Sequence, residues 1–235
     1  MALPKLNTPQ YELELPSTGG KIKFRPFLVK EQKILMMAQE SETESEISDA
    51  ISSIIYACTS GVIDAKNSPL FDVEYVFLQL RAKSVGDIVQ LSIKCPDDEE
   101  TYADVTVDLD EVDVQIDESH SNIINITDDI KMIMKYPQMT DIKLNNVSNT
   151  ETESVFEILK KCILEVHNGD EIINSIDMKP KEISEFIDSL NTQQFESVMQ
   201  FFNTMPKVRH VVSVLNPKTK VTGEVLLEGL QSFLG

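Results

Sequence analysis

The sequence predicts an α+β fold in which helical segments alternate with antiparallel β-hairpins. Apolar residues recur every three or four positions in stretches such as 47–58, which is typical of helices with one buried face. Apolar and polar residues alternate in 88–95 and in 102–109, and the short loop between them predicts a hairpin. A second alternating pair follows near the C-terminus. Both hairpins pass through an X-Pro turn after a helical block, and this weak repeat suggests two similar halves.

Residues 1–28 are expected to form an extended arm followed by a hairpin. "YELEL" and "KIKFRPF" both alternate in polarity, and "PSTGG" between them consists of residues that favour turns. We treat this range as the first segment of the chain.

The second segment, residues 29–149, is expected to hold helices and an acidic hairpin region. "VKEQKILMMAQE" predicts one helix, "SETESEISDAISSIIYACTSG" a second, and "SPLFDVEYVFLQLRAKSVG" a third that begins at Ser68-Pro69. "DIVQLSIKC" and "TYADVTVDL" then predict the two strands of the hairpin, and "VDVQI" and "IKMIMKYP" predict further short strands.

The third segment, residues 150–235, is expected to be helical at first and to end in a β-hairpin and a short helix. An apolar stripe from Val155 to Val166 predicts a helix that "NGD" ends, and His167 is expected to lie at its C-terminus. "KPKEISEFIDSLN" and "TQQFESVMQFFNTM" predict two more helices. "VRHVVSVLNPKTKVTGEVLLEGL" then predicts the second hairpin, and "LEGLQSFLG" the final helix.

Composition and charge exclude several classes of protein. With 41% apolar residues in 235, the chain is expected to fold, and we find no apolar run long enough for a membrane helix. The N-terminus does not resemble a signal peptide, and the three widely spaced cysteines do not suggest disulfides, so an intracellular location is expected. A net charge of −18 disfavours binding to nucleic-acid phosphates.

The charge is unevenly distributed along the chain. Thirteen of the 39 acids lie between Cys95 and Asp129, a stretch without Lys or Arg, whereas the first 30 residues are net basic. This asymmetry suggests a surface for a partner, although charge runs are more often solvated faces.

No constellation of residues in the sequence indicates catalysis or a cofactor. The phosphate-binding, nucleophile-elbow and zinc-protease motifs are absent, and the three histidines lie outside any such motif. The loop "CPDDEE" lacks the second cysteine of a zinc knuckle and the pattern of a calcium loop, so we expect a hairpin tip whose acids point into water. The sequence therefore predicts a non-enzyme with no catalytic, metal or cofactor-binding residues.

Two stretches carry a family resemblance. "KIKFRPFLVKEQKILMMA" (21–38) and "LQLRAKSVGDIVQLSIKC" (78–95) resemble the baseplate family of T4-type contractile-tailed phages, and the ending "VLLEGLQSFLG" is similar to the C-terminus of that family. The resemblance implies a structural or assembly protein of the baseplate hub that binds other hub and tail proteins as a hetero-oligomer. It further implies a place in the host cytoplasm during assembly and in the virion tail. Relatives are expected to carry a CxxC pair at one or both hairpin tips, where this chain has "CPDD" and "NPKT", so no metal role is carried over.

An assembly protein needs surfaces for partners, and two apolar stretches are candidates. One is the helix that follows "KFRPF", and the other is the C-terminus, because chain ends fray unless something holds them. Apolar stripes on helices belong more often to a core than to an interface. The expected partner-binding residues are Phe27, Ile34, Leu35, Met36, Leu230, Phe233 and Leu234.

Two other function classes remain open at this stage. The acidic region 95–129 would suit a metal-dependent hydrolase, in which carboxylates hold a cation. Alternatively, an acidic chain of this kind would suit a DNA-mimicking inhibitor that occupies the basic groove of a nucleic-acid-binding protein.

Overall fold

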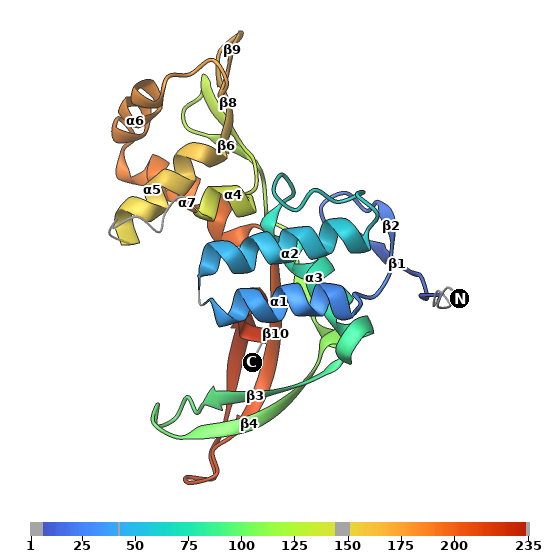
Figure 1. Ribbon diagram of the computed structural model, residues 1–235. Helices are drawn as coiled ribbons and strands as arrows, with labels where there is room; N and C mark the ends of the chain where they lie inside the picture. The colour runs from blue at the N-terminus through green and yellow to red at the C-terminus, as the bar shows by residue number, and fades with distance from the viewer. Residues whose placement is uncertain (1–6, 42, 144–150, 234–235) are drawn as a thin grey trace, which may run out of the picture. The chain divides into compact units, whose positions relative to one another are not determined.

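The computed structural model describes residues 7–41, 43–143 and 151–233, and the fold is α+β as predicted (Figure 1). The chain forms two compact units. Unit 1 comprises Met1–Gln115 together with Lys207–Gly235, and unit 2 comprises Ile116–Pro206. Unit 2 is therefore an insertion in the chain of unit 1.

Among its described residues, unit 1 contains three α-helices, three small β-sheets and two short 3-10 helices. The predicted N-terminal hairpin and the three predicted helices all form. The elements are β1 (Tyr11–Glu14), β2 (Lys21–Phe24), α1 (Val29–Glu40), α2 (Glu44–Cys58), α3 (Leu70–Val85), β3 (Ile88–Lys94), β4 (Tyr102–Asp108), η1 (Leu109–Glu111), β5 (Asp113–Gln115), β10 (Lys207–Leu215), β11 (Thr222–Glu228) and η3 (Leu230–Phe233).

The strands of unit 1 pair as the alternation of polarity predicts. Strand β3 pairs antiparallel with β4, and β10 pairs with β11 in a second long hairpin. The short β5 adds to the other edge of β10, with Gln115 opposite Lys207. Val89, Leu91 and Val107 point to the buried side of the β3–β4 hairpin, and its other face carries mostly polar residues together with the exposed Ile88 and Tyr102.

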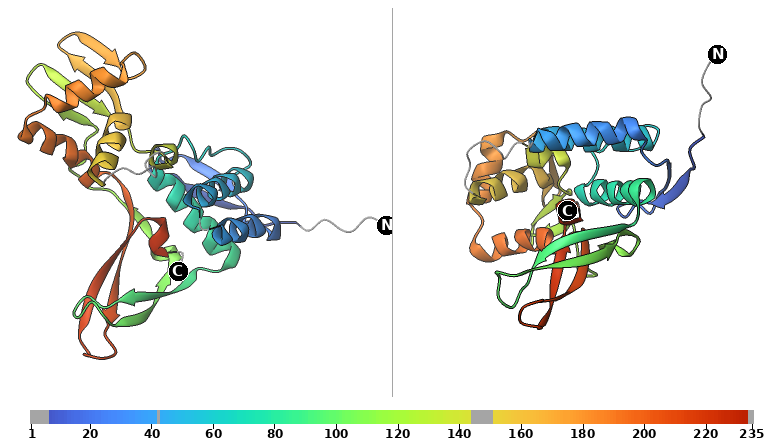
Figure 2. Two further views of the ribbon diagram at one scale, coloured as in Figure 1. Left: turned by 60° about the vertical axis from the view of Figure 1, so that its left-hand side comes forward. Right: turned by 60° about the horizontal axis from the view of Figure 1, so that its bottom comes forward.

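Helix α3 is the centre of unit 1. It contacts α2 on one side, and β5, β10 and η3 on the other, so that it lies between the α1–α2 pair and the strands (Figure 2). This position explains why α3 is apolar on nearly all sides, in contrast to a surface helix with a single stripe. Its buried apolar residues are Phe71, Val73, Val76, Phe77, Leu78, Leu80 and Ala82.

Unit 2 is a four-stranded antiparallel sheet with helices packed against it. The strand order is β6-β7-β8-β9, with neighbours along the chain paired side by side. Met132 and Val166 lie opposite each other in this sheet and belong to a core shared with Leu159, Val198 and Phe201. The elements are β6 (Ile123–Asn125), β7 (Ile130–Met134), α4 (Met139–Lys143), α5 (Glu151–Cys162), β8 (Ile163–Asn168), β9 (Glu171–Asn174), α6 (Pro180–Asp188) and α7 (Thr192–Thr204).

The helix predicted through Val166 is wrong in its second part. Helix α5 ends at Cys162, and Ile163–Asn168 form strand β8 between β7 and β9. His167 therefore lies in a strand, where its Nε2 is 2.7 Å from the Glu165 carboxylate, and it does not end a helix. The short and mainly apolar stretch Ile163–Val166 fits the periodicity of a helix as well as that of a strand. Pairing with two neighbouring strands makes it a strand.

The compact units do not coincide with the three segments 1–28, 29–149 and 150–235 expected from the sequence. Each expected segment is one continuous stretch of the chain. Unit 1 is not continuous, because β10 and β11 belong to it and come after unit 2 in the sequence. No helix among the described residues is both long and apolar enough to cross a membrane.

His120 is half-buried and packs against aromatic side chains of unit 2. Its ring stacks on Tyr136 and lies 5.2 Å, between ring centroids, from Phe201. The hydroxyl of Thr204 donates to the Gln200 carbonyl, so it accepts from Nδ1 of His120, and Nδ1 carries the proton. The other ring nitrogen, Nε2, is buried and has no hydrogen-bond partner among the described residues. Burial lowers the pKa of His120, and the nearby Asp117 carboxylate only partly opposes this.

This environment predicts that protonation of His120 destabilises unit 2. The folded-state pKa is below the unfolded value of about 6.5, so the full stability is present above that pH and falls as the pH decreases towards the folded pKa. We expect His120→Phe to reduce the pH dependence of the free energy of unfolding below about pH 6.5, measured by urea denaturation. A slope equal to that of the unsubstituted protein would contradict the assignment.

Candidate functional site

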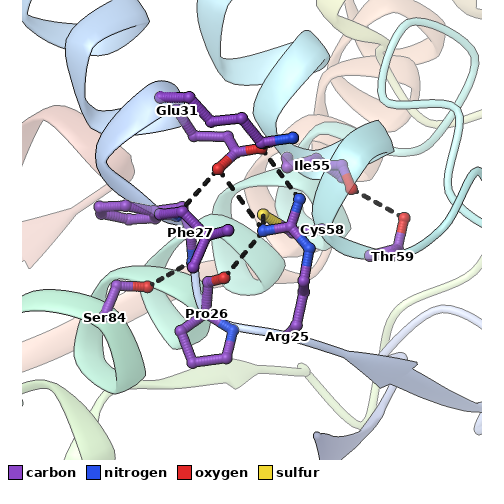
Figure 3. A network of polar contacts seen from close by, with 10 residues as sticks. Arg25, Pro26, Phe27, Glu31, Ile55, Cys58, Thr59 and Ser84 are labelled. Carbon is purple, nitrogen blue, oxygen red and sulfur yellow. Dashed lines mark hydrogen bonds and ion pairs between the residues drawn. The ribbon is translucent and has the colours of Figure 1, made fainter. Parts of the chain in front are cut away.

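A buried ion pair positions helix α1, which carries three of the expected partner-binding residues. Arg25, directly after β2, donates to Glu31 on α1 with 2.9 Å between Nη2 and Oε1 (Figure 3). The guanidinium also donates to the carbonyl of Pro26, and the backbone N–H of Arg25 donates to the carbonyl of Cys58 at the end of α2. One side chain and its backbone thus connect β2, α1 and α2.

Glu31 is the third residue of α1 and also completes the start of the helix. Its Oε2 accepts the backbone N–H of Leu28 at 2.8 Å, which is the position where an N3 glutamate satisfies an otherwise free donor. Only 3% of the residue is exposed. Burial acts to raise the pKa of Glu31, but the hydrogen bonds from Arg25, Leu28 and Lys30 outweigh it and hold the pKa below its usual value. The glutamate is therefore ionised and paired at neutral pH.

The neighbours of this ion pair attach the same region to α3. The N–H of Phe27 donates to Ser84 Oγ at 2.9 Å (Figure 3). Ser84 in turn donates to the carbonyl of Leu80. The Cys58 thiol lies 3.6 Å from Nη1 of Arg25, and burial raises the pKa of Cys58 to about 11. This cysteine is therefore a neutral, buried group, as its place on an apolar stripe predicts.

The expected partner-binding residues fall into two groups. Phe27, Leu230 and Phe233 are buried in unit 1, and Leu35 is half-buried. Leu230 packs beside α3, where its N–H donates to Glu74, so the C-terminal residues Leu230–Phe233 are already held within the unit. Leu234 lies outside the described residues.

Met36 is 54% exposed on the side of α1 that faces away from Glu31 and Ala38. Ile34 is 44% exposed and lies at the edge of the buried side, three residues after Glu31 and four before Ala38. Three exposed neighbours on this helix were not among the partner-binding residues expected from the sequence: Val29, Lys33 and Met37. A signal was present, because Val29, Lys33 and Met36 recur at helical spacing opposite the buried residues. The exposure of these residues was not predicted because apolar residues on a helix belong more often to a core than to a surface.

The hairpin tip at Cys95 and the tip at Asn216 begin with the same kind of turn, although the Cys95 tip is one residue longer before its strands pair again. In each, a fully buried first residue is followed by proline, and its carbonyl accepts the N–H of the residue four positions on. That residue, Glu99 in one tip and Lys220 in the other, has a positive φ. The repeat seen in the sequence thus extends to the geometry of the two turns.

The two tips are joined by side-chain hydrogen bonds. Asp97 accepts from Asn216 Nδ2 at 2.9 Å through Oδ1 and from the Thr219 hydroxyl at 2.5 Å through Oδ2. The bond from Thr219, followed by that from Asn216, lowers the pKa of Asp97. Close packing accompanies these bonds, since a Cβ placed on Gly223 would lie only 2.5 Å from Cγ of Pro96.

The acids of the first tip therefore do not all point into water as expected. Asp98 accepts from the hydroxyl and N–H of Thr101 and from the N–H of Glu100, and the first of these bonds is the largest cause of its lowered pKa. Asp97 joins the two tips, while Glu99 and Glu100 are exposed. The two aspartates hold the turn and the junction together by hydrogen bonds.

A cluster of three carboxylates lies at the other end of the β3–β4 hairpin. Oxygens of Asp87, Asp108 and Asp110 lie within 4.8 Å of one another. Lys83 Nζ contacts both oxygens of Asp110, at 2.8 and 2.7 Å, and so supplies a positive charge to this cluster. Within the described residues, the feature that best fits a functional role is the exposed apolar side of α1, which the rest of unit 1 supports.

Substitution of Arg25 tests the buried pair. Arg25→Met leaves Glu31 buried without its main partner, so we expect the free energy of unfolding to fall by about 3–5 kcal/mol. Arg25→Met combined with Glu31→Gln removes the charge but retains an acceptor for Leu28, and should recover part of this loss. Lys30→Met is the control, because Lys30 is exposed to water and its pairing with Glu31 is expected to contribute no more than about 1 kcal/mol. Equal losses for Arg25→Met and Lys30→Met in urea denaturation would contradict the role assigned to the pair.

Substitution of Asp97 tests the junction between the hairpin tips. We expect Asp97→Ala to increase the rate of amide hydrogen exchange at residues 218–221, which lie in the other tip, because Asn216 and Thr219 lose their acceptor. Glu100→Ala, at an exposed position of the same loop, should leave those amides unchanged. Exchange rates that respond equally to both substitutions would show that the tips are not coupled through Asp97.

The comparisons with known proteins agree with the resemblance seen in the sequence. The family model described as T4 bacteriophage base plate protein matches residues 8–235, which covers both units. No curated protein and no solved structure matches the chain. The chain, with its two units and its hairpins joined at the tips, belongs to the family of T4 bacteriophage base plate proteins.

Proposed function

We propose that this protein is a non-enzymatic component or assembly factor of the phage baseplate hub and acts by binding other baseplate and tail proteins. The observation that carries the proposal is the family match over residues 8–235, since nearly the whole chain corresponds to a baseplate protein. The exposed apolar residues of α1 support it, because clustered apolar side chains on a surface are typical of protein interfaces.

The proposal places the protein in the host cytoplasm during assembly and in the tail of the virion if it is a permanent component. Hub proteins that bind one another form hetero-oligomers, and binding of this kind requires no cofactor. The net charge of −18 is consistent with protein partners and unfavourable for nucleic acid.

Co-expression tests the proposal. The tagged full chain is produced together with each other baseplate protein of the same phage, one at a time, and the purified product is analysed by light scattering. We expect a complex of fixed stoichiometry with at least one of them. If the chain remains alone in every combination, the proposal fails.

Mass spectrometry of purified virions distinguishes the two roles within the proposal. A component is present in the particle at a constant copy number, whereas an assembly factor is absent from the particle but present in tail precursors. Absence from both the particle and its precursors would contradict a baseplate role.

A further inference from the structure

Unit 2 contains a pocket of about 480 Å³ in which three lysine side chains gather. The pocket lies between α4, the end of α5 and the segment that leads from β9 into α6 (Figure 1). Lys135 comes directly after β7, and Lys160 and Lys161 belong to the last turn of α5. Two acids, Asp141 and Glu157, also line the pocket. A pocket of this size is large enough for a small organic molecule or for one residue of a peptide.

The three ammonium groups of this pocket differ in their contacts. Lys160 Nζ pairs with Glu157 Oε1 at 2.7 Å. Lys161 donates to the backbone carbonyl of Asp141 at 3.0 Å, and this bond uses one of the three N–H groups of its ammonium. Lys135 is half-buried, and within the part of the chain that the structure describes its ammonium group has no hydrogen-bond or ion-pair partner. The pocket therefore offers donors that are available to a ligand.

The end of α5 does not by itself account for three lysines. The C-terminus of a helix carries about half an elementary negative charge, which favours Lys160 and Lys161 in the last turn. Lys135 arrives from another segment, because its backbone N–H donates to the carbonyl of Cys162 at 2.7 Å. Burial raises the pKa of Cys162 to about 12, and Lys135 and Lys161 oppose this rise, so both ammonium groups lie near the same thiol.

The lining of the pocket is positive in a protein that is negative overall. Three lysines outnumber the two acids by one, and the end of α5 offsets about half of that excess. Asp177 and the lysines at the start of α6 lie outside the lining and are exposed to water, where charges act more weakly. Those lysines are also paired within α6: Lys179 with Glu182 and Lys181 with Glu185. The whole chain has a net charge of −18, so the small positive excess in the pocket is a local exception.

The lining also has an apolar part, which restricts the ligand further. Four apolar residues contribute to it: Ile163, Met178, Pro180 and Ile183. A ligand that suits both parts has a negative group for the lysines and a short apolar group for these side chains. A single carboxylate matches the small excess of positive charge, whereas the two charges of a phosphate exceed it and are repelled by Asp141 and Glu157. The described lining contains no arginine, whose planar fork is suited to phosphate.

We propose that this pocket binds a monocarboxylate that is joined to a short apolar group, with Lys135 and Lys161 donating to the carboxylate. Two sources offer this chemistry: a free acid with a short apolar chain, and the C-terminal residue of a polypeptide with an apolar side chain. The inference does not depend on the proposed function, because it concerns a pocket in unit 2 and holds whether or not the exposed side of α1 binds a partner.

Titration of the full chain with small probes tests the proposal, and amide resonances of the pocket residues are followed by NMR. We expect hexanoate and N-acetyl-leucine to shift these resonances with dissociation constants on the order of 1 mM, as is usual for ligands of this size. Hexanol and N-acetyl-leucine amide lack the charge, and inorganic phosphate lacks the apolar group, so each should bind at least tenfold more weakly. Tighter binding of N-acetyl-leucine indicates the end of a polypeptide as the source, and tighter binding of hexanoate indicates a free acid.

Substitution of Lys135 tests the residue that the proposal depends on most. Lys135→Met removes a charged donor and should weaken hexanoate binding at least tenfold, whereas Lys135→Arg keeps the charge and should retain most of the affinity. Lys181→Met, which removes an exposed lysine outside the lining, is the matched control and should change the affinity by less than about twofold. Because Lys135 has no partner to lose, Lys135→Met is expected to fold. Hexanoate should raise the Tm of the unsubstituted chain and of Lys181→Met, but not that of Lys135→Met.

Three results would overturn the proposal. The first is that neither carboxylate probe shifts the pocket resonances at about ten times the expected dissociation constant. The second is that inorganic phosphate binds as tightly as hexanoate, which would contradict the choice of a monocarboxylate. The third is that Lys135→Met and Lys181→Met affect hexanoate binding equally, which would place the bound probe outside the pocket.

Discussion

The ion pair between Arg25 and Glu31 is the constraint on which the helical side of unit 1 depends. A glutamate that is almost entirely buried is tolerated only when its charge is compensated, and here the guanidinium and a helix N-terminal N–H do so together. The compensation fixes where β2 ends, where α1 begins and how the end of α2 approaches them. Because packing turns Glu31 and Ala38 of α1 inward, residues on the opposite side of the helix, such as Val29 and Met36, are left exposed.

The junction of the hairpin tips shows a different use of polar side chains. Asp97 in one hairpin tip accepts hydrogen bonds from Asn216 and Thr219 in the other, more than a hundred residues away in the chain. The ladder bonds of a hairpin hold only its own two strands together, so the side-chain bonds at the tips add a link between the two hairpins.

Local periodicity predicted most elements of this fold, and contacts distant in the sequence account for the rest. Helix α1 matches its predicted range because capping and apolar spacing are both local properties. Strand β8 was missed because its three apolar residues, Ile163, Leu164 and Val166, suit a helix as well as a strand, and the neighbouring strands β7 and β9 decide between them. The family could be recognised from sequence stretches, whereas burial of Phe27, Leu230 and Phe233 and exposure of Met37 depend on packing that no local pattern contains.

The insertion of unit 2 between β5 and β10 also determines the order in which the protein can fold during synthesis. All residues of unit 2 leave the ribosome before β10, β11 and η3, so unit 2 has its complete sequence while unit 1 still lacks a central strand. Until then, the apolar side of α3 that later receives β10 and Phe233 has no cover from those elements. The nascent chain therefore carries exposed apolar surface until residues 207–233 are made, a period in which chaperones or early partners would find a binding site that the folded unit no longer offers.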